Sequence, residues 1–324
     1  MTSIKRIGTH DGCFHCDEVL AVVLLKHLPE YKNASVVRSR DPDVLSVCDV
    51  VVDVGGVYDP QTYRFDHHQK DFSLTWSKYF DVKMWDVKLS SAGLVYVHFG
   101  KRVLSLLTGL EINHEVLEKI FMRVYESFIL EIDGQDNGTP QSKMPLKYNI
   151  NTGLYCRVRR LNPWWNSGSE ESESAFQRAI NLVSREFLDT VDYFANCWWP
   201  ARHIVAQAMS CREDVDPSKM IIVLDRSCPW KSHLFDLERE ERMETSCLSR
   251  ATSPSKLSSR AEVSLLKFSL LFYHQMVIGL FRPYQKRNLK FGYHSLSIGV
   301  HFEMISCVQL LEYQVAFSCI TPDI

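Results

Sequence analysis

The sequence lacks a strong charge of either sign. Its 324 residues contain 37 Lys and Arg against 39 Asp and Glu, which gives a formal net charge of −2. A protein that coats nucleic acid through bulk charge alone needs a much more basic composition. If the substrate is a nucleic acid, it must therefore be held by a local basic patch and by metal ions.

The sequence also lacks a repeated cysteine spacing. Its ten cysteines are scattered, and a chain of this length does not need a disulfide framework, so we expect free thiols in a reducing, intracellular compartment. One alternative is a zinc site at His10, Cys13, His15 and Cys16, because "CFHC" is a Cys-x-x-Cys pair. Structural zinc sites usually combine two such pairs. The absence of a second pair disfavours zinc here.

Long uninterrupted apolar runs are scarce. The first residues, "MTSIKRIGTHDG", contain no apolar signal-peptide core, and a strand expected from residue 4 leaves no room for a long transit peptide. The best membrane candidate, residues 263–281, contains Lys267, His274 and Gln275, which disfavours a transmembrane helix. The sequence contains no internal repeats, and it does not indicate an oligomeric state.

The sequence does contain an alternation of strand and helix patterns. Strands are expected over 4–9, 34–40, 48–56 and 63–65, with helices over 16–28 and 41–47. Longer helices are expected over 90–107, capped by Ser90 or Ser91, and over 113–133, capped by Asn113. This order predicts an α/β fold with a parallel sheet, in which ligands bind at the carboxyl ends of the strands.

Side chains that bind hard cations gather at those strand ends. The candidate donors are His10, His15, Asp17, Asp53, Asp66, His67, His68 and Asp133. Carboxylates and imidazoles together suit Mn²⁺ or Mg²⁺, and clustered carboxylates repel one another unless a cation lies between them. Two ions about 3.5–4 Å apart, bridged by a carboxylate such as Asp53, would activate a water molecule for attack on phosphorus.

Several of these residues have a plainer interpretation when taken alone. Asp53 at a strand end is typical of a turn or a helix cap, and Asp133 is typical of a turn after a helix. The adjacent triplet Asp66, His67 and His68 in "YRFDHHQKDF" is harder to explain in this way. The joint occurrence of donors at predicted element ends favours a metal centre for the whole set.

Four ordered motifs resemble those of the DHH phosphoesterase superfamily: "THDGCFHCDEVLA", "VVDVGG", "RFDHHQ" and "EIDGQDNG". The stretches "RSRDPDVLSVCDVVVDVGGVYDP", "LSSAGLVYVHFG", "RVRRLNPWWN" and "CPWKSHLFDLE" are similar to a eukaryotic branch of it, the melanocyte-proliferating-gene exonuclease family. The resemblance covers about residues 7–238 and implies a DHH phosphoesterase domain followed by an incomplete second lobe.

The resemblance assigns roles by motif. The metal ligands that it implies are His10, His15, Asp17, Asp53, Asp66, His67 and Asp133, with Asp53 as the bridging carboxylate. The catalytic residues that it implies are Asp53, His67 and His68. Asp136 and Asn137 follow the fourth motif and are expected to support its loop. The superfamily commonly has an aspartate where this sequence has His15, one position further from His10.

The function implied by the resemblance is hydrolysis of single-stranded RNA from its 3′ end, with two divalent ions, in the nucleus and the mitochondrion. The substrate-binding residues that we expect are Arg157, Arg159, Arg160 and Trp164, with Lys143 and Lys147 just upstream. Arginine grips phosphate with two parallel hydrogen bonds, and Trp164 or Trp165 would stack on a base. The alternative for the tryptophans is a structural position in the core or at the interface between the lobes.

The domain organisation follows from where the family pattern ends. We expect a metal-binding α/β domain at 1–170, a connecting helix at 171–200 and the start of a second substrate lobe at 201–240, with a further strand at 220–225. Residues 241–324 form a divergent, poorly ordered tail in this interpretation. Two alternative functions stay open: a hydrolase of small phosphoesters or pyrophosphate, and a non-catalytic truncated isoform.

Overall fold

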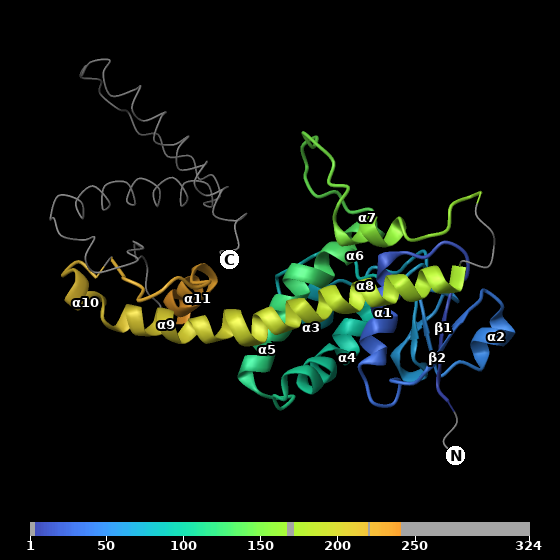
Figure 1. The fold of residues 1–324 in the computed structure, drawn as a ribbon, viewed down its shortest axis with the longest axis horizontal. Coiled ribbons are helices and arrows are strands. Elements are labelled where there is room, and N and C mark those ends of the chain that lie inside the picture. The colour runs from blue at the N-terminus through green and yellow to red at the C-terminus, as the bar shows by residue number, and fades with distance from the viewer. Residues whose placement is uncertain (1–3, 167–171, 220, 241–324) are drawn as a thin grey trace. The chain divides into compact units, whose positions relative to one another are not determined.

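The computed structural model describes residues 4–166, 172–219 and 221–240. Within them, five strands form one sheet in the order β2-β1-β3-β5-β4 (Figure 1). The strands are β1 (Arg6–Thr9), β2 (Ser35–Arg38), β3 (Val50–Val52), β4 (Tyr58–Asp59) and β5 (Arg64–Phe65). The pairs β1–β2, β1–β3 and β3–β5 are parallel, and β4 is an antiparallel edge strand. The predicted α/β fold with a mostly parallel sheet is confirmed.

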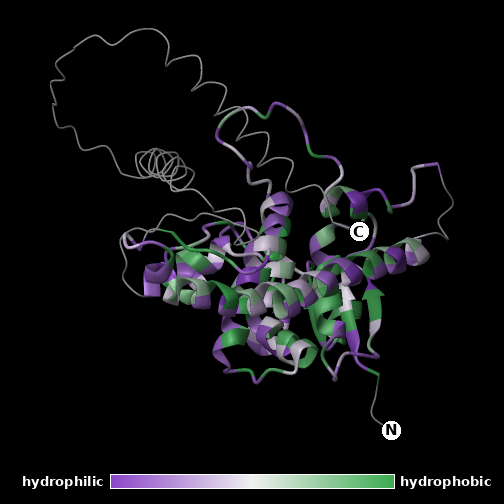
Figure 2. Ribbon diagram, turned by 60° about the vertical axis from the view of Figure 1, so that its left-hand side comes forward, coloured by the Kyte–Doolittle hydropathy of each residue, from purple (hydrophilic) through white to green (hydrophobic). Residues whose placement is uncertain are grey.

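Helices make up most of the remaining described chain. They are α1 (Cys16–Lys26), α2 (Pro42–Ser46), η1 (Pro60–Thr62), α3 (Trp76–Phe80), α4 (Ser91–Thr108), α5 (Glu115–Val124), the π-helical η2 (Tyr125–Ile129), α6 (Leu130–Asp136), α7 (Leu154–Arg159), α8 (Ser172–Asp192), the π-helical η4 (Tyr193–Trp198), α9 (Trp199–Ser210), α10 (Arg212–Val215) and α11 (Lys231–Glu240). Figure 2 shows largely hydrophobic strands beside helices of mixed hydropathy.

The two faces of the sheet are covered unequally, because successive strand residues point to opposite sides. Ile7, Val50 and Phe65 lie in the main hydrophobic core, to which α1 and α4 also contribute. On the other face, Val51 packs in a small cluster beneath α2. Gly8 faces the same helix, where a Cβ atom would come within 3.1 Å of neighbouring side chains. The α2 helix therefore lies close against the sheet at this glycine.

The second long helix extends further than the sequence predicts. Its cap is His114 rather than Asn113, since the His114 side chain accepts a backbone N–H of the first turn. The helix then continues through η2 and α6 to Asp136, and Gly134 stays helical. The glycine with a left-handed φ of 65° that follows this helix is Gly138. The glycine signal for a helix end was thus assigned to the wrong glycine.

The stretch predicted as a connecting helix at 171–200 contains α8 and η4, which lead directly into α9 (Figure 1). Phe176, Val183 and Phe187 of α8 are buried in the main core. This helix is therefore part of the same packed unit as the sheet over much of its length. The division into 1–170, 171–200 and 201–240 stays a prediction.

The strand predicted at 220–225 is wrong for the described residues of that stretch. Residues 221–225 make no β-ladder, although Ile222 and Leu224 are buried with Val205 and Leu234 between α9 and α11. An apolar run predicts burial, but a strand also needs a paired neighbour, and none lies beside this run in the part of the chain that the structure describes.

No helix in the described ranges has the length and hydrophobicity of a transmembrane span. The stretch 263–281, the tail 241–324 and residue 220 lie outside the described residues.

Candidate metal centre

The carboxyl ends of the parallel strands bring the predicted donors together. His10 follows β1, Asp53 follows β3, and Asp66 to His68 follow β5. Asp53 has a left-handed backbone with φ of 60°, which is uncommon for a residue other than glycine. Such a conformation persists only where the surroundings hold it, and it often marks a functional position.

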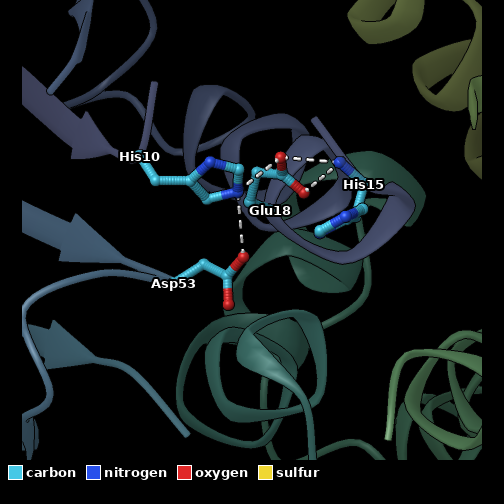
Figure 3. A group of neighbouring side chains, drawn as sticks. All are labelled: His10, His15, Glu18 and Asp53. Atoms are coloured by element: carbon cyan, nitrogen blue, oxygen red, sulfur yellow. Dashed lines mark hydrogen bonds and ion pairs between the residues drawn. The ribbon is translucent and has the colours of Figure 1, made fainter. Parts of the chain in front are cut away.

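The first turn of α1 supplies further donors to the same place. His15 is the N-cap of α1, and Glu18 accepts its backbone N–H at 2.7 Å. Glu18 is also 3.0 Å from Nε2 of His10, measured to its Oε1. Figure 3 shows the His10 ring between the carboxylates of Glu18 and Asp53. Together with Asp17, these residues place two buried carboxylates at the start of the helix.

Asp53 lies between the histidines of two different strand ends. Its Oδ2 is 3.4 Å from Nε2 of His10, and its Oδ1 is 3.3 Å from Nε2 of His67. The same Oδ1 is 3.6 Å from Nδ1 of His68. One carboxylate thus spans both sides of the site, as a bridging ligand must.

His67 faces a second set of carboxylates. Its Nε2 is 3.2 Å from Oδ2 of Asp136 in α6 and 3.9 Å from Oδ2 of Asp17 in α1. Both oxygens of Asp17 and both ring nitrogens of His67 are buried and make no hydrogen bond to any described residue. Buried polar atoms without a hydrogen bond require an explanation, and a bound cation is one.

Among the residues that the structure describes, three groups of side chains have donor atoms that all lie within 4.8 Å of one another, and each could hold a metal ion. They are His10, His15, Glu18 and Asp53; Asp53, His67 and His68; and His15, Asp17 and Asp136. Asp53 and His15 each belong to two groups. We call these eight residues the donor centre.

Charges within the donor centre shift its pKa values in opposite directions. Burial lowers the pKa of His10, but the Asp53 and Glu18 carboxylates outweigh it and raise that pKa to about 10. In the same way Asp136 and Asp53 overcome burial and raise the pKa of His67 to about 9.

Burial and the neighbouring Asp53 raise the pKa of Asp17 well above its usual range. Burial opposes ionisation of Asp53, yet the two histidines hold its pKa below the usual range. The excess of buried acids is suited to a cation.

Asp66 lies beside the donor centre and supports it. Its Oδ2 accepts the Gly56 N–H at 2.6 Å, and its Oδ1 accepts hydrogen bonds from the backbone and from Nδ1 of His68. Asp66 is absent from the three groups, which cover the described residues. Its hydrogen bonds instead fix the turn after β3 and the orientation of His68.

Asp133 is placed differently from the other predicted ligands. Its Oδ1 accepts hydrogen bonds from the backbone and hydroxyl of Ser90, and its Oδ2 accepts one from Tyr125 at 2.9 Å. It is fully buried and belongs to none of the three groups found among described residues. Burial raises the pKa of Asp133 to about 7, against the opposing effect of these donors. Asp136, expected only to support the loop, is the residue of α6 that faces His67.

Sequence reasoning also missed Glu18. It follows His15 by three positions, so "HCDE" resembles a helix capping box, and it does cap α1. Its second role becomes visible only when His10 lies beside it. The zinc alternative gains no support, because neither Cys13 nor Cys16 joins a donor group in the described chain. All seven described cysteines are free thiols, as predicted.

Three of the four predicted substrate residues line a separate cavity of about 610 Å³, which we call the Arg–Trp cavity. It is lined by Asn151, Cys156, Arg159, Arg160, Asn162, Pro163 and Trp164. Trp164 and Trp165 are exposed, so they are not core residues. Arg157 does not line this cavity, because it forms an ion pair with Glu186 of α8 at 2.8 Å.

The other two arginines differ from each other. Arg160 donates to the backbone carbonyls of Cys156 and Asn151 and so holds the loop together. The guanidinium of Arg159 has no ion pair or hydrogen bond to any described residue. Lys143 and Lys147 lie on the exposed loop before α7. Arg159 is therefore the arginine of this set that is available to a ligand.

The fold and the site define the class of this protein: an α/β protein with a buried carboxylate–imidazole centre at the strand ends of a parallel sheet. A family model, MYG1_exonuc, described as "Uncharacterised protein family (UPF0160)", matches residues 6–257. The chain belongs to this MYG1 family, which confirms the predicted exonuclease family; the DHH superfamily stays a prediction.

Curated relatives agree with the family match. The chain is 49% identical over 235 residues to "MYG1 exonuclease" of Bos taurus and 48% identical over 235 residues to that of Homo sapiens, with 72% of this chain and 62% of each relative covered. It is 37% identical over 249 residues to a "MYG1 protein" of Saccharomyces cerevisiae, covering 74% and 72%. The chain thus spans less than two thirds of the length of the mammalian relatives. No significant match to a solved structure was found.

Proposed function

We propose that this chain is a metal-dependent phosphodiester hydrolase of the DHH type that removes nucleotides from the 3′ end of single-stranded RNA. The names of the mammalian relatives support exonuclease activity. The observation that carries the metal dependence is the set of buried donor atoms of Asp17 and His67 that make no hydrogen bond within the described chain. The nuclear and mitochondrial location stays a prediction from the family resemblance.

The donor centre would hold two divalent ions, Mn²⁺ or Mg²⁺. Asp53 is the bridging candidate because its two oxygens face different histidines. When bound, such ions neutralise phosphate charge and lower the pKa of a coordinated water molecule. The chain itself supplies a rigid set of acids, which are buried and therefore act in a medium of low polarity.

His68 is suited to contact the substrate. Its side chain is exposed, unlike that of His67, and its Nδ1 donates to Asp66 at 2.8 Å. This hydrogen bond fixes the ring and leaves Nε2 as the free end. The Asp66 carboxylate raises the pKa of His68 and favours the cationic imidazolium. We infer that His68 binds a phosphate oxygen and can give a proton to the leaving oxygen.

The Arg–Trp cavity would hold the rest of the RNA strand. Asn162, on its wall, accepts the Phe14 N–H and donates to the Phe14 carbonyl, both at 2.8 Å. Phe14 precedes His15 of the donor centre, so the cavity wall is joined directly to the metal site. A strand that continues past the metals would meet Arg159 and the exposed Trp164, which suit a phosphate and a base.

A small-phosphoester hydrolase is the weaker alternative. A cavity of about 270 Å³ lies at the donor centre. Among the described residues that line it, Arg40 is the one arginine or lysine. The Arg40 guanidinium is 3.2 Å from Asp11 and exposed. A free, compact polyanion would need more positive charge than this pocket offers, whereas a polymer is also held along its length.

The test is degradation of a 5′-labelled single-stranded RNA with Mn²⁺ by wild type and by Asp53→Asn. Asparagine tolerates a left-handed backbone, so this variant removes the charge with little strain. Asp71→Asn, an exposed aspartate of the same loop region as His68, is the matched control. We expect products shortened from the 3′ end with wild type and with the control, but not with Asp53→Asn.

Each other outcome selects an alternative. Degradation that persists in Asp53→Asn points to a contaminating nuclease. Hydrolysis of pyrophosphate or a mononucleotide without RNA degradation favours the small-substrate enzyme. If wild type binds Mn²⁺ in calorimetry but hydrolyses none of these substrates, the chain is a non-catalytic member of its family.

A further inference from the structure

Two consecutive serines at the start of α4 contact two carboxylates from distant parts of the chain. The Ser91 hydroxyl donates to Oδ1 of Asp53 at 3.1 Å. The Ser90 hydroxyl and N–H donate to Oδ1 of Asp133 at 2.7 and 2.9 Å. Both serines are fully buried. The N-terminus of one helix therefore fixes both the strand-end aspartate and the α6 helix.

The plain explanation for a serine at this position is helix capping, and the structure argues against it. Ser90 is the N-cap of α4, but its side chain makes no capping hydrogen bond. Its hydroxyl is used for Asp133 instead. A cap of this kind is ordinarily worth about 1 kcal/mol to a helix, so the contact with Asp133 replaces a favourable local interaction.

The contact with Asp53 controls how its carboxylate is rotated. Oδ1, which accepts from Ser91, is the oxygen that faces His67 and His68, while Oδ2 faces His10. A donor on Oδ1 holds the carboxylate plane so that each oxygen points to its own side. A carboxylate that is free to turn could not keep both directions.

The contact with Asp133 controls where Asp136 lies. The two residues are three positions apart on α6, so they lie on nearby faces of one helix. Asp133 is held by Ser90 and by Tyr125, and a Cβ atom on Gly93 of α4 would overlap its carboxylate. This close approach of α4 and α6 sets the position of Asp136 relative to His67. Oδ2 of Asp136 is 3.2 Å from Nε2 of His67.

We propose that Ser90 and Ser91 are positioning residues that set the separation of Asp53 and Asp136 around a divalent cation. Ser91 orients Asp53 directly, and Ser90 orients Asp136 through Asp133. This role rests on the metal centre proposed above. It also gives Asp133 a function that differs from that of a ligand: it is the anchor of α6.

The test is Mn²⁺ binding to the full chain, measured by calorimetry and by the EPR spectrum of the bound ion. We expect Ser91→Ala and Ser90→Ala each to weaken Mn²⁺ affinity by about 10–100-fold, the usual effect of losing a partner of a metal ligand. The EPR line shape should change, and Ser91→Thr, which keeps the hydroxyl, should restore both. Ser105→Ala removes a hydroxyl at the other end of α4, where it donates to the Leu110 carbonyl, and should leave affinity unchanged.

The outcomes separate the two proposals. If wild type binds no Mn²⁺, the metal centre is wrong and the positioning role falls with it. If wild type binds Mn²⁺ and Asp53→Asn does not, but both serine variants match wild type in affinity and spectrum, the positioning role alone is overturned. A lower melting temperature with unchanged affinity would also overturn it. If Ser90→Ala fails to fold, Tyr125→Phe removes the other side-chain donor to Asp133 and tests the same anchor.

Discussion

Asp17 and Trp165 mark opposite extremes of this molecule: the aspartate is 0% exposed and the tryptophan 97% exposed. The donor centre takes its residues from strand ends and helices that are packed on the main core. The Arg–Trp cavity is formed by α7 and the loops beside it. The first is a rigid arrangement whose charges repel without a cation, and the second offers a free guanidinium and exposed rings.

The difference indicates a division of labour. Under the proposed function, the chemistry that needs fixed distances would lie on regular elements, where neighbouring side chains restrict each donor. Binding of a variable polymer would lie on loops, where stacking and phosphate contacts tolerate different sequences. Substitutions in the two regions should therefore differ in size and in kind.

The largest effect should come from Asp53→Asn. Removing the charge that faces both histidines should lower Mn²⁺ affinity by more than about 100-fold. This exceeds the usual effect of losing a residue that only hydrogen-bonds to a metal ligand. RNA affinity in the absence of metal should change little, because the Arg–Trp cavity is untouched. Calorimetry with Mn²⁺ and a separate RNA-binding titration measure the two quantities. Equal losses of Mn²⁺ affinity and of RNA affinity would show that the two regions do not act separately.

Gly93→Ala tests how tightly the donor side is packed. A methyl group would overlap the Asp133 carboxylate, so we expect a loss of about 1–3 kcal/mol in unfolding free energy, as for other overpacked positions. Gly134→Ala is the matched control, because its nearest neighbour would be 3.9 Å away and alanine favours a helix. Urea unfolding of both variants gives the comparison, and equal stabilities would contradict it.

Asn162→Ala tests the connection between the two regions. The change leaves the Phe14 N–H and carbonyl without their side-chain partner, which should cost about 1–3 kcal/mol in unfolding free energy. RNA binding should weaken as well, since the cavity wall loses its attachment. Glutamine at this position keeps the amide but not its reach and should rescue little. If RNA affinity is unchanged in both variants, Asn162 does not connect the Arg–Trp cavity to the donor centre.

A pH effect is expected away from both regions, at His233. Burial lowers the pKa of His233, and its Nε2 lies 2.6 Å from the Trp198 carbonyl. Because the pKa is depressed in the folded state, the stabilisation is present above the unfolded value near 6.5 and is lost as the pH falls below it. The unfolding free energy should fall by up to about 1.4 kcal/mol per pH unit there. His27 and His98, whose pKa values burial also lowers, contribute to the same slope. His233→Gln should therefore reduce this slope, and an unchanged slope between pH 5 and 6.5 would contradict the prediction.

The smallest effect should come from Arg159→Ala. One exposed phosphate contact is lost, so RNA of any sequence should bind a few-fold more weakly. The slope of log affinity against log salt concentration should fall in magnitude by about 1. Mn²⁺ affinity should not change. Arg185→Ala, an exposed arginine of α8, is the control. An unaltered slope for Arg159→Ala would remove the cavity from the substrate path.

The sequence predicted the positions of several donor-centre residues at element ends because the signals for those ends are local. Alternation of strands and helices placed His10, Asp53 and His67 at successive strand ends, and parallel strands bring such ends to one edge. The resemblance assigned the ligand role to Asp133 and loop support to Asp136, although the two stand three positions apart on nearby faces of α6. The position of Asp133 depends on its hydrogen bonds with Ser90 and Tyr125. The sequence does not show that these residues lie close to Asp133 in space.

The exposed side was predicted less well, for a different physical reason. Three arginines close together indicate a basic patch, but a helix turns successive side chains in different directions. Arg157 consequently reaches Glu186 on α8, and Arg160 reaches backbone carbonyls of its own loop. Tertiary partners of this kind leave no mark in composition or spacing.

The π-helical segment η2 carries one more consequence for this molecule. A π turn holds an additional residue compared with an α turn, and such turns occur frequently at functional sites. The wider turn accommodates this residue, so the same residues wound as an ordinary α-helix would turn α6 about its axis. Asp136 would then no longer face His67, so the π turn sets the angular position of this carboxylate in the donor centre.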